Sequence, residues 1–366
     1  MCHDGQRPVS TVSKGEWMYG DDAGRTHRTA RTGLRTGAVA LVAMALLTAC
    51  SGSGGDDTGG DENRRTQQQG ADAPFWVNPD GSAAQALDQA RADGREDEAA
   101  LIEKIADQPV GEWIGTDDTS AETRRITAAA EEAGRPALLV LYNIPHRDCD
   151  QYSQGGAADG AAYRAWLDQV VEGIGDREAW VVLEPDALAH ILVPGCVPQE
   201  FHQEQYDVMR EAVTKLKALP STRVYLDAGN PRWVRDAGGM VEPLKRAGVE
   251  EADGFSLNVS NYQTTRENVE YGDTLSSMLD GKSFIVDTSR NGNGPVEGME
   301  DEEAWCNPPG RALGEPPTTD TGEKNVDAFV WVKRPGESDG QCKGGPDAGQ
   351  WFNEYALDLA RNAEQS

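Results

Sequence analysis

The amino-acid sequence predicts an α/β fold in which seven parallel strands form a closed or nearly closed, TIM-like β/α barrel. From about residue 107, short apolar runs recur along the chain, and each ends abruptly in polar or charged residues. Amphipathic segments lie between these runs. Continuous apolar runs that alternate with helical patterns indicate a parallel sheet covered on both faces. Seven such units in about 250 residues fit a barrel.

The expected strands are short apolar runs, as suits elements buried on both faces. In chain order they are Val110–Ile114, Ala137–Leu141, Ala179–Leu183, Val224–Leu226, Gly254–Leu257, Ser283–Val286 and Ala328–Val332. The segments between them carry apolar residues at helical spacing. Helices are expected at Ala161–Ile174, His202–Leu219, Met240–Ala247 and Thr265–Leu279, with a final helix at Trp351–Ala363. An open doubly wound sheet is the alternative, but no GxGxxG motif follows the first run.

The first fifty residues resemble an export signal. Four arginines between positions 25 and 35 precede the apolar stretch Gly37–Leu47, which is followed by small residues and Cys50. These eleven residues are too few to span a bilayer, since a spanning helix needs about 20. Leu47–Cys50 is similar to the lipobox of bacterial lipoproteins, in which the cysteine is acylated and becomes the mature N-terminus. An ordinary cleaved signal with an incidental cysteine is the alternative.

Three segments follow from this interpretation. Residues 1–49 are expected to be a signal peptide with a lipobox, and the part before about Met18 is an overlong start or a long basic region. Residues 50–73 are the lipidated cysteine and a Gly/Ser/Asp/Gln-rich flexible tether. Residues 74–366 form the folded body, about 290 residues that fit one large domain.

The charge balance excludes two classes of partner. The chain has 62 acidic and 34 basic residues, which give a formal net charge of −28. Nucleic-acid binding needs clustered cations, and an anionic lipid surface would repel this charge. We therefore expect no nucleic-acid partner, and a membrane contact only through the lipid anchor. Only five histidines occur, two of them near the N-terminus, so a zinc hydrolase is not expected. We expect no metal and no cofactor.

The cysteines agree with export. Apart from Cys2 and Cys50, four remain, at positions 149, 196, 306 and 342. An even number in an exported chain favours two disulfides, and four cysteines allow three connectivities. A four-cysteine zinc site is the alternative, although no CxxC spacing occurs.

Polar side chains follow the expected strands where each run ends. After the second, third and fourth runs these are Asp148, Glu184, Asp186 and Asp227. After the later runs they are Asn258, Asn261, Tyr262, Asp287, Arg290, Lys333, Glu337 and Asp339. One such aspartate alone would be a helix cap or turn residue. Carboxylates at several strand ends indicate a cleft for acid/base chemistry, because barrel sites lie at the carboxyl ends of the strands.

Seven motifs, in order, resemble family 6 of the glycoside hydrolases, the bacterial and fungal endoglucanases and cellobiohydrolases that cut β-1,4-glucan. They are Tyr142–Cys149, Glu184–Asp186, Tyr225–Gly229, Asn258–Tyr262, Asp287–Gly292, Trp305–Asn307 and Val332–Gly340. The resemblance covers about Phe75 to Ala363 and implies one glycoside hydrolase catalytic domain over residues 74–366. It also implies a distorted seven-stranded barrel and inversion at the anomeric carbon.

The resemblance also implies roles for individual residues. Asp186 corresponds to the general acid, and Asp148 to a carboxylate that tunes its pKa and organises the attacking water. Asp339 corresponds to the candidate base, and Asp227 to a further aspartate in the cleft. Tyr142 is expected close to the distorted sugar. Three cations, Arg147, Arg290 and Lys333, are placed to hold neighbouring carboxylates ionised.

Substrate contacts are expected from further residues of these motifs. Trp113, Trp233 and Trp305 are candidates to stack on sugar rings, with packing in the core or rim as the alternative. The other expected contacts come from Asn230, Asn258, Arg290, Lys333 and Glu337. Asn230 replaces a histidine of the family, and Gln154 stands where the family often has a serine. The disulfides implied by the resemblance are Cys149–Cys196 and Cys306–Cys342.

The length of the loop after Asp339 bears on the mode of cleavage. Only Gly340–Gln350, eleven residues, separate Asp339 from the last expected helix. Such a short loop resembles the open-cleft endoglucanases. We therefore expect an endo-β-1,4-glucanase on the extracellular face of the bacterial membrane, lipid-anchored, or secreted if the lipobox is not used. We expect a monomer that binds β-1,4-glucan. The alternatives are a cellobiohydrolase and an inactive glucan-binding surface lipoprotein.

Overall fold

The structure, a computed structural model, describes residues 73–150, 152–298 and 304–364. The predicted signal peptide, Cys50 and the tether up to residue 72 lie outside the described residues. Over the described ranges, no helix is both long and apolar enough to cross a membrane.

The centre of the fold is one parallel sheet of seven strands in the order of the sequence. The strands are β1 (Glu112–Trp113), β2 (Ala137–Leu141), β3 (Ala179–Leu183), β4 (Thr222–Asp227), β5 (Gly254–Leu257), β6 (Ser283–Asp287) and β7 (Val326–Val330). Each pairs with the next in parallel register. This unreversed order confirms the predicted β/α barrel and excludes the doubly wound alternative, whose strand order reverses at a switch point.

The barrel does not close by strand pairing, because β1 and β7 are the two edges of the sheet. The seam between them is bridged by a bond from the amide of Gly111 to the carbonyl of Trp331 (2.8 Å). A second bond runs from the indole nitrogen of Trp113 to the carbonyl of Val332 (3.0 Å). The chain approaches so closely here that a Cβ at position 111 would lie 2.6 Å from the Val332 oxygen. The barrel is therefore nearly closed, as predicted.

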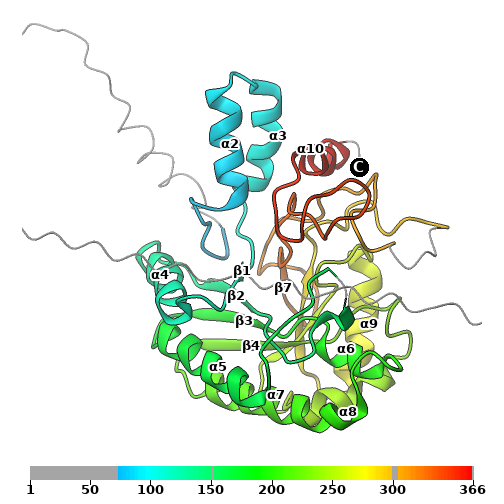
Figure 1. Ribbon diagram of the computed structural model, residues 1–366. Helices are drawn as coiled ribbons and strands as arrows, with labels where there is room; N and C mark the ends of the chain where they lie inside the picture. Colours follow the sequence, from blue (N-terminus) through cyan, green and yellow to red (C-terminus); the bar gives the residue numbers. More distant parts are fainter. Residues whose placement is uncertain (1–72, 151, 299–303, 365–366) are drawn as a thin grey trace, which may run out of the picture. The chain divides into compact units, whose positions relative to one another are not determined.

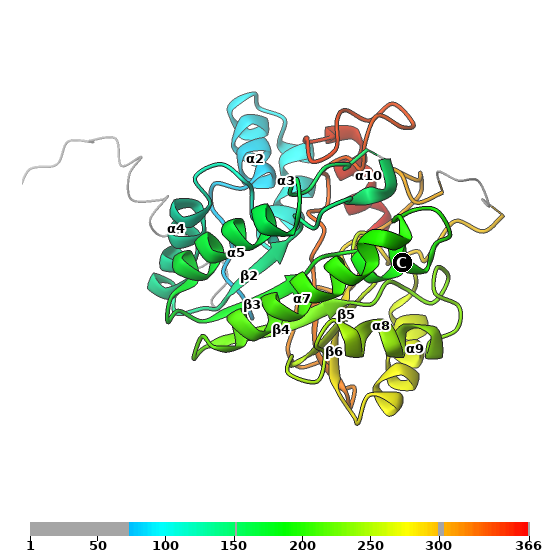
Figure 2. The same ribbon diagram turned by 60° about the horizontal axis from the view of Figure 1, so that its bottom comes forward.

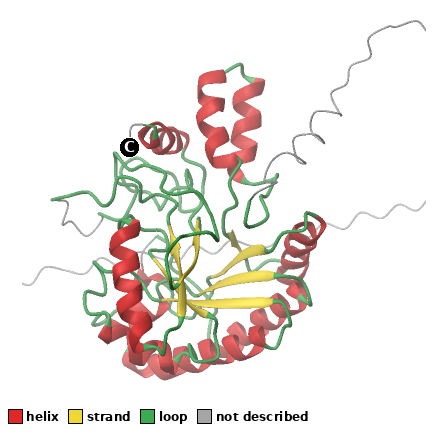
Figure 3. Cartoon of the chain, turned by 180° about the vertical axis from the view of Figure 1, so that it is seen from behind, coloured by secondary structure: helices red, strands yellow, loops and turns green. Residues whose placement is uncertain are grey.

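Helices cover the outer side of the sheet (Figures 2 and 3). They are α4 (Thr119–Glu132), α5 (Gly160–Ile174), α6 (Ala187–Leu192), α7 (His202–Lys217), α8 (Gly238–Arg246) and α9 (Thr265–Met278). Alternate strand residues face opposite sides. Leu139 and Val181 pack in the cluster with Trp166 and Leu167 of α5, whereas Val140 and Val182 pack inside the barrel. Burial on both faces explains why these strands consist of unbroken apolar runs.

The first and last helices form a separate layer beside the seam. Helices α2 (Ser82–Ala92) and α3 (Glu96–Ala106) form a hairpin, and α10 (Asn353–Ala363) packs against α3 (Figure 1). The final helix was expected from the sequence, whereas the hairpin, α4 and α6 were not. Two short 3-10 turns, η1 (Asp148–Asp150) and η2 (Gln199–Phe201), complete the described elements.

Four expected strands differ in their bounds from those observed: β4 and β6 are longer than expected, and the larger differences are in β1 and β7. Only residues 112–113 of Val110–Ile114 pair as β1, and β7 begins two residues before Ala328 and ends at Val330. Trp331 and Val332 are buried although they lie beyond the last ladder partner. They contact the β1 segment across the seam, so their apolar character reflects burial there rather than strand pairing.

Candidate active site

The turns after β2 and β3 have a backbone conformation that non-glycine residues rarely adopt. The φ angles are 66° at Asp148, 49° at Glu184 and 69° at Asp186, all in the left-handed region. A side chain in this region costs free energy, so such residues persist only where the surrounding structure fixes them, and they cluster at functional sites. The turns thus present Asp148 and Asp186 in fixed positions at the carboxyl end of the sheet.

Asp227, the last residue of β4, holds the backbone of Asp186. Its Oδ1 accepts hydrogen bonds from the amides of Asp186 (2.9 Å) and Gly229 (3.1 Å). The hydroxyl of Ser256 donates to its Oδ2 (3.3 Å). Asp227 is only 1% exposed, so it supports the backbone of Asp186 from inside the protein. Burial raises its pKa to about 6, although these hydrogen bonds oppose the shift.

Asp186 is the carboxyl group of this cluster best suited to donate a proton. Burial raises its pKa well above the usual range, and the neighbouring Asp227 and Asp148 raise it further. Two nearby negative charges disfavour a third, so the surroundings of Asp186 favour its protonated form. The residue is nevertheless partly exposed, which leaves its side chain within reach of a substrate. These are the two requirements of a general acid.

Asp148 lies in a loop that folds back on itself. Its Oδ2 accepts a hydrogen bond from the amide of Ser153 (2.6 Å). Arg147 donates from Nε to the Ser153 carbonyl (2.8 Å) and from Nη1 to the Tyr142 carbonyl. Burial raises the pKa of Asp148, while Ser153 and Arg147 oppose the shift. Gln154, where the sequence departs from the family, is exposed, and the contact to Asp148 comes from the backbone amide of Ser153.

Tyr142 lies beside both carboxyl groups. Burial raises the pKa of its hydroxyl well above the usual range, and Asp186 and Asp148 raise it further. The guanidinium of Arg147 lies 4.5 Å from the centre of the tyrosine ring, and Trp113 meets that ring edge-on at 5.5 Å. The structure therefore brings together the predicted residues Tyr142, Arg147, Asp148 and Asp186.

Glu184 is a functional residue that the site prediction omitted. Its buried carboxylate accepts hydrogen bonds from the amides of Asn143 (3.0 Å) and Ile144 (2.9 Å). It thereby holds the loop after β2, which carries Tyr142 and Asp148, against the turn after β3. Burial raises its pKa to about 7 despite these bonds. Its place in the Glu-Pro-Asp sequence was the available signal.

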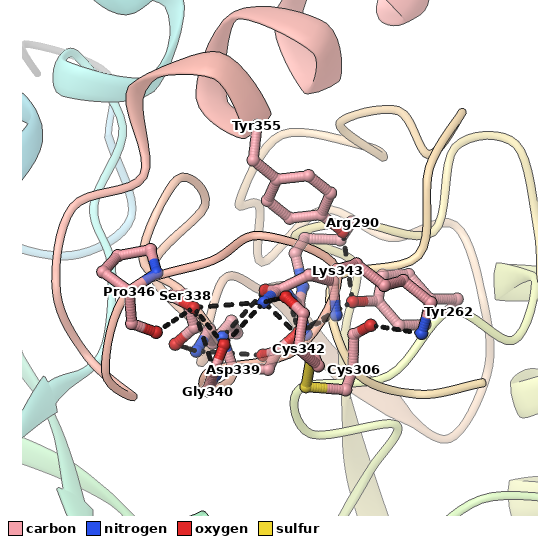
Figure 4. Close-up of a disulfide and its surroundings, with 12 residues drawn as sticks. Tyr262, Arg290, Cys306, Ser338, Asp339, Gly340, Cys342, Lys343, Pro346 and Tyr355 are labelled. Carbon is pink, nitrogen blue, oxygen red and sulfur yellow. Dashed lines mark hydrogen bonds and ion pairs between the residues drawn. A yellow bond between two sulfur atoms is a disulfide. The ribbon is translucent and has the colours of Figure 1, made fainter. Parts of the chain in front are cut away.

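Asp339 lies in the opposite electrostatic setting (Figure 4). Its Oδ2 accepts from Arg290 Nη1 (2.8 Å), the Asn307 amide (3.0 Å) and the Tyr262 hydroxyl (3.1 Å). Its Oδ1 lies 3.1 Å from Lys333 Nζ. Burial alone would raise the pKa of Asp339, but Arg290 and Lys333 hold it well below the usual range. The group is therefore ionised, with four donors on its two oxygens.

Three of the predicted substrate contacts come from side chains that are buried within the protein. Arg290 and Asn258 have no exposed surface, and Asn258 donates to the carbonyl of Asp287 (2.8 Å). Asn230 is 3% exposed, and its Oδ1 accepts from the amides of Arg232 and Trp233 (both 3.1 Å). Sugar contact by Arg290 and Asn258 stays a prediction. Asn230 fixes the turn that carries Trp233.

The remaining predicted contacts come from side chains that are partly exposed or lie close to Asp339 in the chain. Trp113, Trp233 and Trp305 are partly exposed. The ring centre of Trp233 lies 5.0 Å from that of His190, and the ring centre of Trp305 lies 6.1 Å from that of Tyr152. Lys333 is partly exposed next to Asp339. Glu337 is mostly buried, and its Oε1 accepts from Ser82 Oγ (2.8 Å). Sugar contact by these residues stays a prediction.

Both implied disulfides are present, Cys149–Cys196 and Cys306–Cys342. The first joins the Asp148 loop to the segment after α6. The second joins the Asn307 loop to the loop after Asp339 (Figure 4). Among the described residues, His190 comes within 4.8 Å of the sulfurs of Cys149 and Cys196, but the disulfide occupies both sulfurs.

The chain is similar to known proteins over its whole folded body. A family model described as "Glycosyl hydrolases family 6" matches residues 70–363. Endoglucanase A of Cellulomonas fimi is 43% identical over 79% of this chain and 61% of its own length. Endoglucanase 1 of Streptomyces halstedii is 41% identical over 78% of this chain and 88% of its own length.

A solved structure shows the same fold. It is the endoglucanase Cel6 from Mycobacterium tuberculosis in complex with methyl-cellobiosyl-4-deoxy-4-thio-β-D-cellobioside. It is 43% identical in sequence and superposes with a TM-score of 0.75, covering 81% of this chain and 99% of that chain.

Proposed function

Because the chain belongs to glycosyl hydrolases family 6, we propose that it is an inverting endo-β-1,4-glucanase. It hydrolyses internal β-1,4-glucosidic bonds of cellulose or related β-glucans by carboxylate acid/base catalysis. The observation that carries this proposal is the opposed setting of two carboxyl groups, with Asp186 kept protonated and Asp339 kept ionised. The chain spans 61% of the length of the Cellulomonas fimi endoglucanase, so the activity of the whole protein is part of the proposal.

We assign protonation of the leaving group to Asp186. Cleavage of a glycosidic bond needs an acid that is still protonated at the working pH. Asp227 fixes the Asp186 backbone through the 2.9 Å hydrogen bond and, as a neighbouring negative charge, supports the raised pKa of Asp186. The proton passes from the Asp186 carboxyl to the glycosidic oxygen as the bond to the anomeric carbon breaks.

Inversion requires a water molecule on the opposite face of the sugar. We assign the orientation of this water to Asp148, whose carboxylate is fixed by the amide of Ser153 and lies near enough to Asp186 to raise its pKa. Tyr142 lies beside the same two groups, where it limits the position of the sugar ring. In one displacement the water oxygen bonds to the anomeric carbon as the bond to the glycosidic oxygen breaks, and the ionised Asp148 carboxylate accepts the proton that the water loses.

Asp339 remains the candidate base, but its surroundings favour an electrostatic role. A general base works best when its pKa lies near the working pH. The pKa of Asp339 is held well below the usual range by Arg290 and Lys333, and its oxygens already accept from four donors. We therefore assign to Asp339 the stabilisation of the positive charge that develops on the sugar in the transition state.

Two observations support internal cleavage. Proteins named endoglucanases match this chain at 41–43% identity. The loop between Asp339 and the last helix is short, which suits an open cleft that binds the middle of a chain. A cellobiohydrolase of the same family is the second candidate. A glucan-binding protein without activity is the third, but binding alone would not require Asp148, Asp186, Asp227 and Asp339 together.

The signal interpretation places the enzyme outside the cell. The lipobox-like sequence Leu47–Cys50 supports a lipid anchor on Cys50, with the catalytic domain held at the extracellular face of the membrane as a monomer. The test is expression of wild-type protein and Cys50→Ser in a bacterial host. Wild-type protein should sediment with membranes, and the variant should lose this association. Equal release of both proteins into the medium would reject the anchor.

The endoglucanase proposal is tested with the viscosity of carboxymethylcellulose. The purified protein should lower the viscosity quickly while few new reducing ends form, and Asp186→Asn should abolish this effect. A flat viscosity with cellobiose accumulating from cellulose would show an exo-acting enzyme. A folded protein that cleaves no β-glucan but is retarded by glucan in affinity electrophoresis would support the binding protein instead.

A further inference from the structure

Arg334 lies between two buried glutamates next to the barrel seam. Its Nη2 is 2.9 Å from Oε2 of Glu112, and its Nη1 is 3.5 Å from Oε1 of Glu337. Its Nε donates to the carbonyl of Gly111 (2.9 Å). The side chains of Glu112 and Glu337 are only 6% and 9% exposed, whereas that of Arg334 is 26% exposed. A buried carboxylate without a partner is costly, so this arginine is needed where it lies.

These contacts cross the seam where the sheet lacks a ladder. Glu112 belongs to β1, and Arg334 follows β7 by four residues. The backbone and indole bonds from Gly111 and Trp113 to residues 331 and 332 cross at the same place. Arg334 adds a charged pair and a further hydrogen bond to this junction. Side chains therefore take part in most of the contacts that close the seam, and Arg334 contributes a guanidinium group to them.

The residue before Arg334 belongs to the cleft. Lys333 contacts Oδ1 of Asp339, and its amide donates to Oδ2 of Asp287 (3.0 Å). Lys333 and Arg334 lie in the bend after β7, and their side chains reach different partners. Arg334 accordingly reaches β1 while Lys333 reaches the carboxylate, and any shift of one changes the position of the other. The same seam holds Trp113, which packs on Tyr142.

The hairpin of α2 and α3 reaches this junction from outside. Ser82, the first residue of α2, donates to the oxygen of Glu337 that faces Arg334. A small cavity here is lined by Ser82, Ile105, Glu112, Arg334 and Pro335. The junction is thus enclosed by three parts of the chain that lie far apart in sequence, and its two carboxylates are largely shielded from solvent.

We propose that Arg334 and Glu112 form a clasp that positions Lys333 and Asp339 for catalysis. Both are positioning residues. In the part of the chain that the structure describes, their hydrogen bonds and ion pairs reach neither the candidate acid Asp186 nor Asp148. The clasp replaces the missing ladder between β1 and β7 and keeps the segment 331–340 in place. The catalytic part of this inference rests on the proposed glucanase function.

The test compares Glu112→Gln and Arg334→Lys with the matched control Glu211→Gln, which alters an exposed pair between α5 and α7. Glu112→Gln keeps the shape of the side chain but removes its charge. We expect its kcat on a soluble cello-oligosaccharide to fall about tenfold while KM stays within about twofold, because a misplaced catalytic group slows chemistry more than binding. Arg334→Lys should lose less, since it keeps the charge, and Glu211→Gln should be unchanged.

Amide hydrogen exchange gives a readout that does not depend on activity. Glu112→Gln should speed exchange in peptides covering 331–340, whose amides at Lys333 and Asp339 bond to Asp287 and Asn307. Exchange in β4 should not change. If wild-type protein cleaves no β-glucan, the proposed function fails while the exchange still tests the clasp. The clasp is rejected if exchange in 331–340 is unchanged, or if the loss of kcat only follows the fraction of unfolded protein.

Discussion

The carboxyl groups of Asp186 and Asp227, at the ends of β3 and β4, and that of Asp339, after β7, have pKa values shifted in opposite directions. Asp186 and Asp227 lie beside one another with amide and hydroxyl donors around Asp227, and the pKa of each is raised. Asp339 lies between Arg290 and Lys333, and its pKa is lowered. Burial disfavours the charged form in both places, so the difference comes from the neighbouring charges.

This contrast gives the proposed cleft one side on which the Asp186 carboxyl group favours its protonated form and another on which the Asp339 carboxylate stays ionised. A glycosidase needs both, since the leaving oxygen takes a proton while positive charge develops on the sugar. A cation beside Asp186 would lower its pKa, and the cleft would lose its proton donor. Loss of the cations beside Asp339 would raise the pKa of Asp339, and the cleft would lose its fixed negative charge. The following predictions change one side at a time.

The largest effect is expected from the acid itself. Asp186→Asn should lower kcat/KM on carboxymethylcellulose by about 10³-fold, because a positioned general acid contributes about 10²–10⁴-fold. On an aryl cellobioside with an acidic phenol as leaving group, the loss should be much smaller, since that group departs without protonation. The exposed Asp176→Asn serves as control. An equal loss on both substrates would mean that Asp186 is not the acid.

The second effect is the loss of the cation from the anionic side. Arg290→Met should lower the free energy of unfolding by about 3–5 kcal/mol, because it leaves the buried Asp339 carboxylate with only Lys333 as a cationic partner. The pKa of Asp339 should rise, so the loss of activity on acidification should begin at a higher pH. Urea unfolding and a pH–rate profile measure the two effects. Arg164→Met, which breaks the exposed pair with Glu211, should change neither.

The third effect concerns stability on the protonated side. The pKa of Glu184 is about 7 in the folded protein against an ordinary 4.5. Its contribution to stability is therefore fully present below pH 4.5 and is lost as the pH rises through about 7, up to about 3 kcal/mol. Urea unfolding at several pH values should show this decline for wild-type protein and less of it for Glu184→Gln. A similar decline in Glu184→Gln and the exposed Glu178→Gln would assign it to other groups.

The smallest effect tests the coupling between the two aspartates. Asp227→Asn keeps an oxygen that can accept from the Asp186 amide but removes the negative charge. The pKa of Asp186 should fall, so activity at the alkaline end of the profile should drop about tenfold with less change at acidic pH. Asp253→Asn, which lies just before β5 and accepts a hydrogen bond from the Val224 amide of β4, is the matched control. A uniform loss across the pH range would indicate a structural role only.

Much of this architecture follows from the sequence. The unbroken apolar runs at β2 and β3 and the largely apolar runs at β5 and β6 are typical of strands buried on both faces, and the structure places strands there. Because the strands are parallel and consecutive, the residues at their carboxyl ends were bound to meet at one edge. Asp148, Asp186, Asp227 and Asp339 could therefore be assigned to one site, and the resemblance supplied the pairing of the cysteines.

Other features depend on contacts that no local pattern encodes. Glu184 and Asp186 are two residues apart and would share a face in a regular strand. The left-handed turn at both residues breaks that alternation, so that one carboxylate is buried under the β2 loop while the other is accessible. The position of Arg290 after β6 likewise predicted a residue of the cleft. Its hydrogen bond to Asp339, 49 residues further along the chain, instead holds the side chain inside the protein.

The sequence by itself determined the class of fold, the order of the strands and the set of carboxylates at their ends, because burial and period are local properties of the chain. The tertiary structure decided which of these groups hold a proton, how the seam between β1 and β7 is closed, and where α2 and α3 dock. The pKa of a buried group depends on charges that arrive from distant segments, as Arg290 and Lys333 do at Asp339. Glu112 and Arg334 likewise come from distant segments. Only the tertiary fold brings the Arg334 Nη2 atom within 2.9 Å of the Glu112 Oε2 atom across the seam.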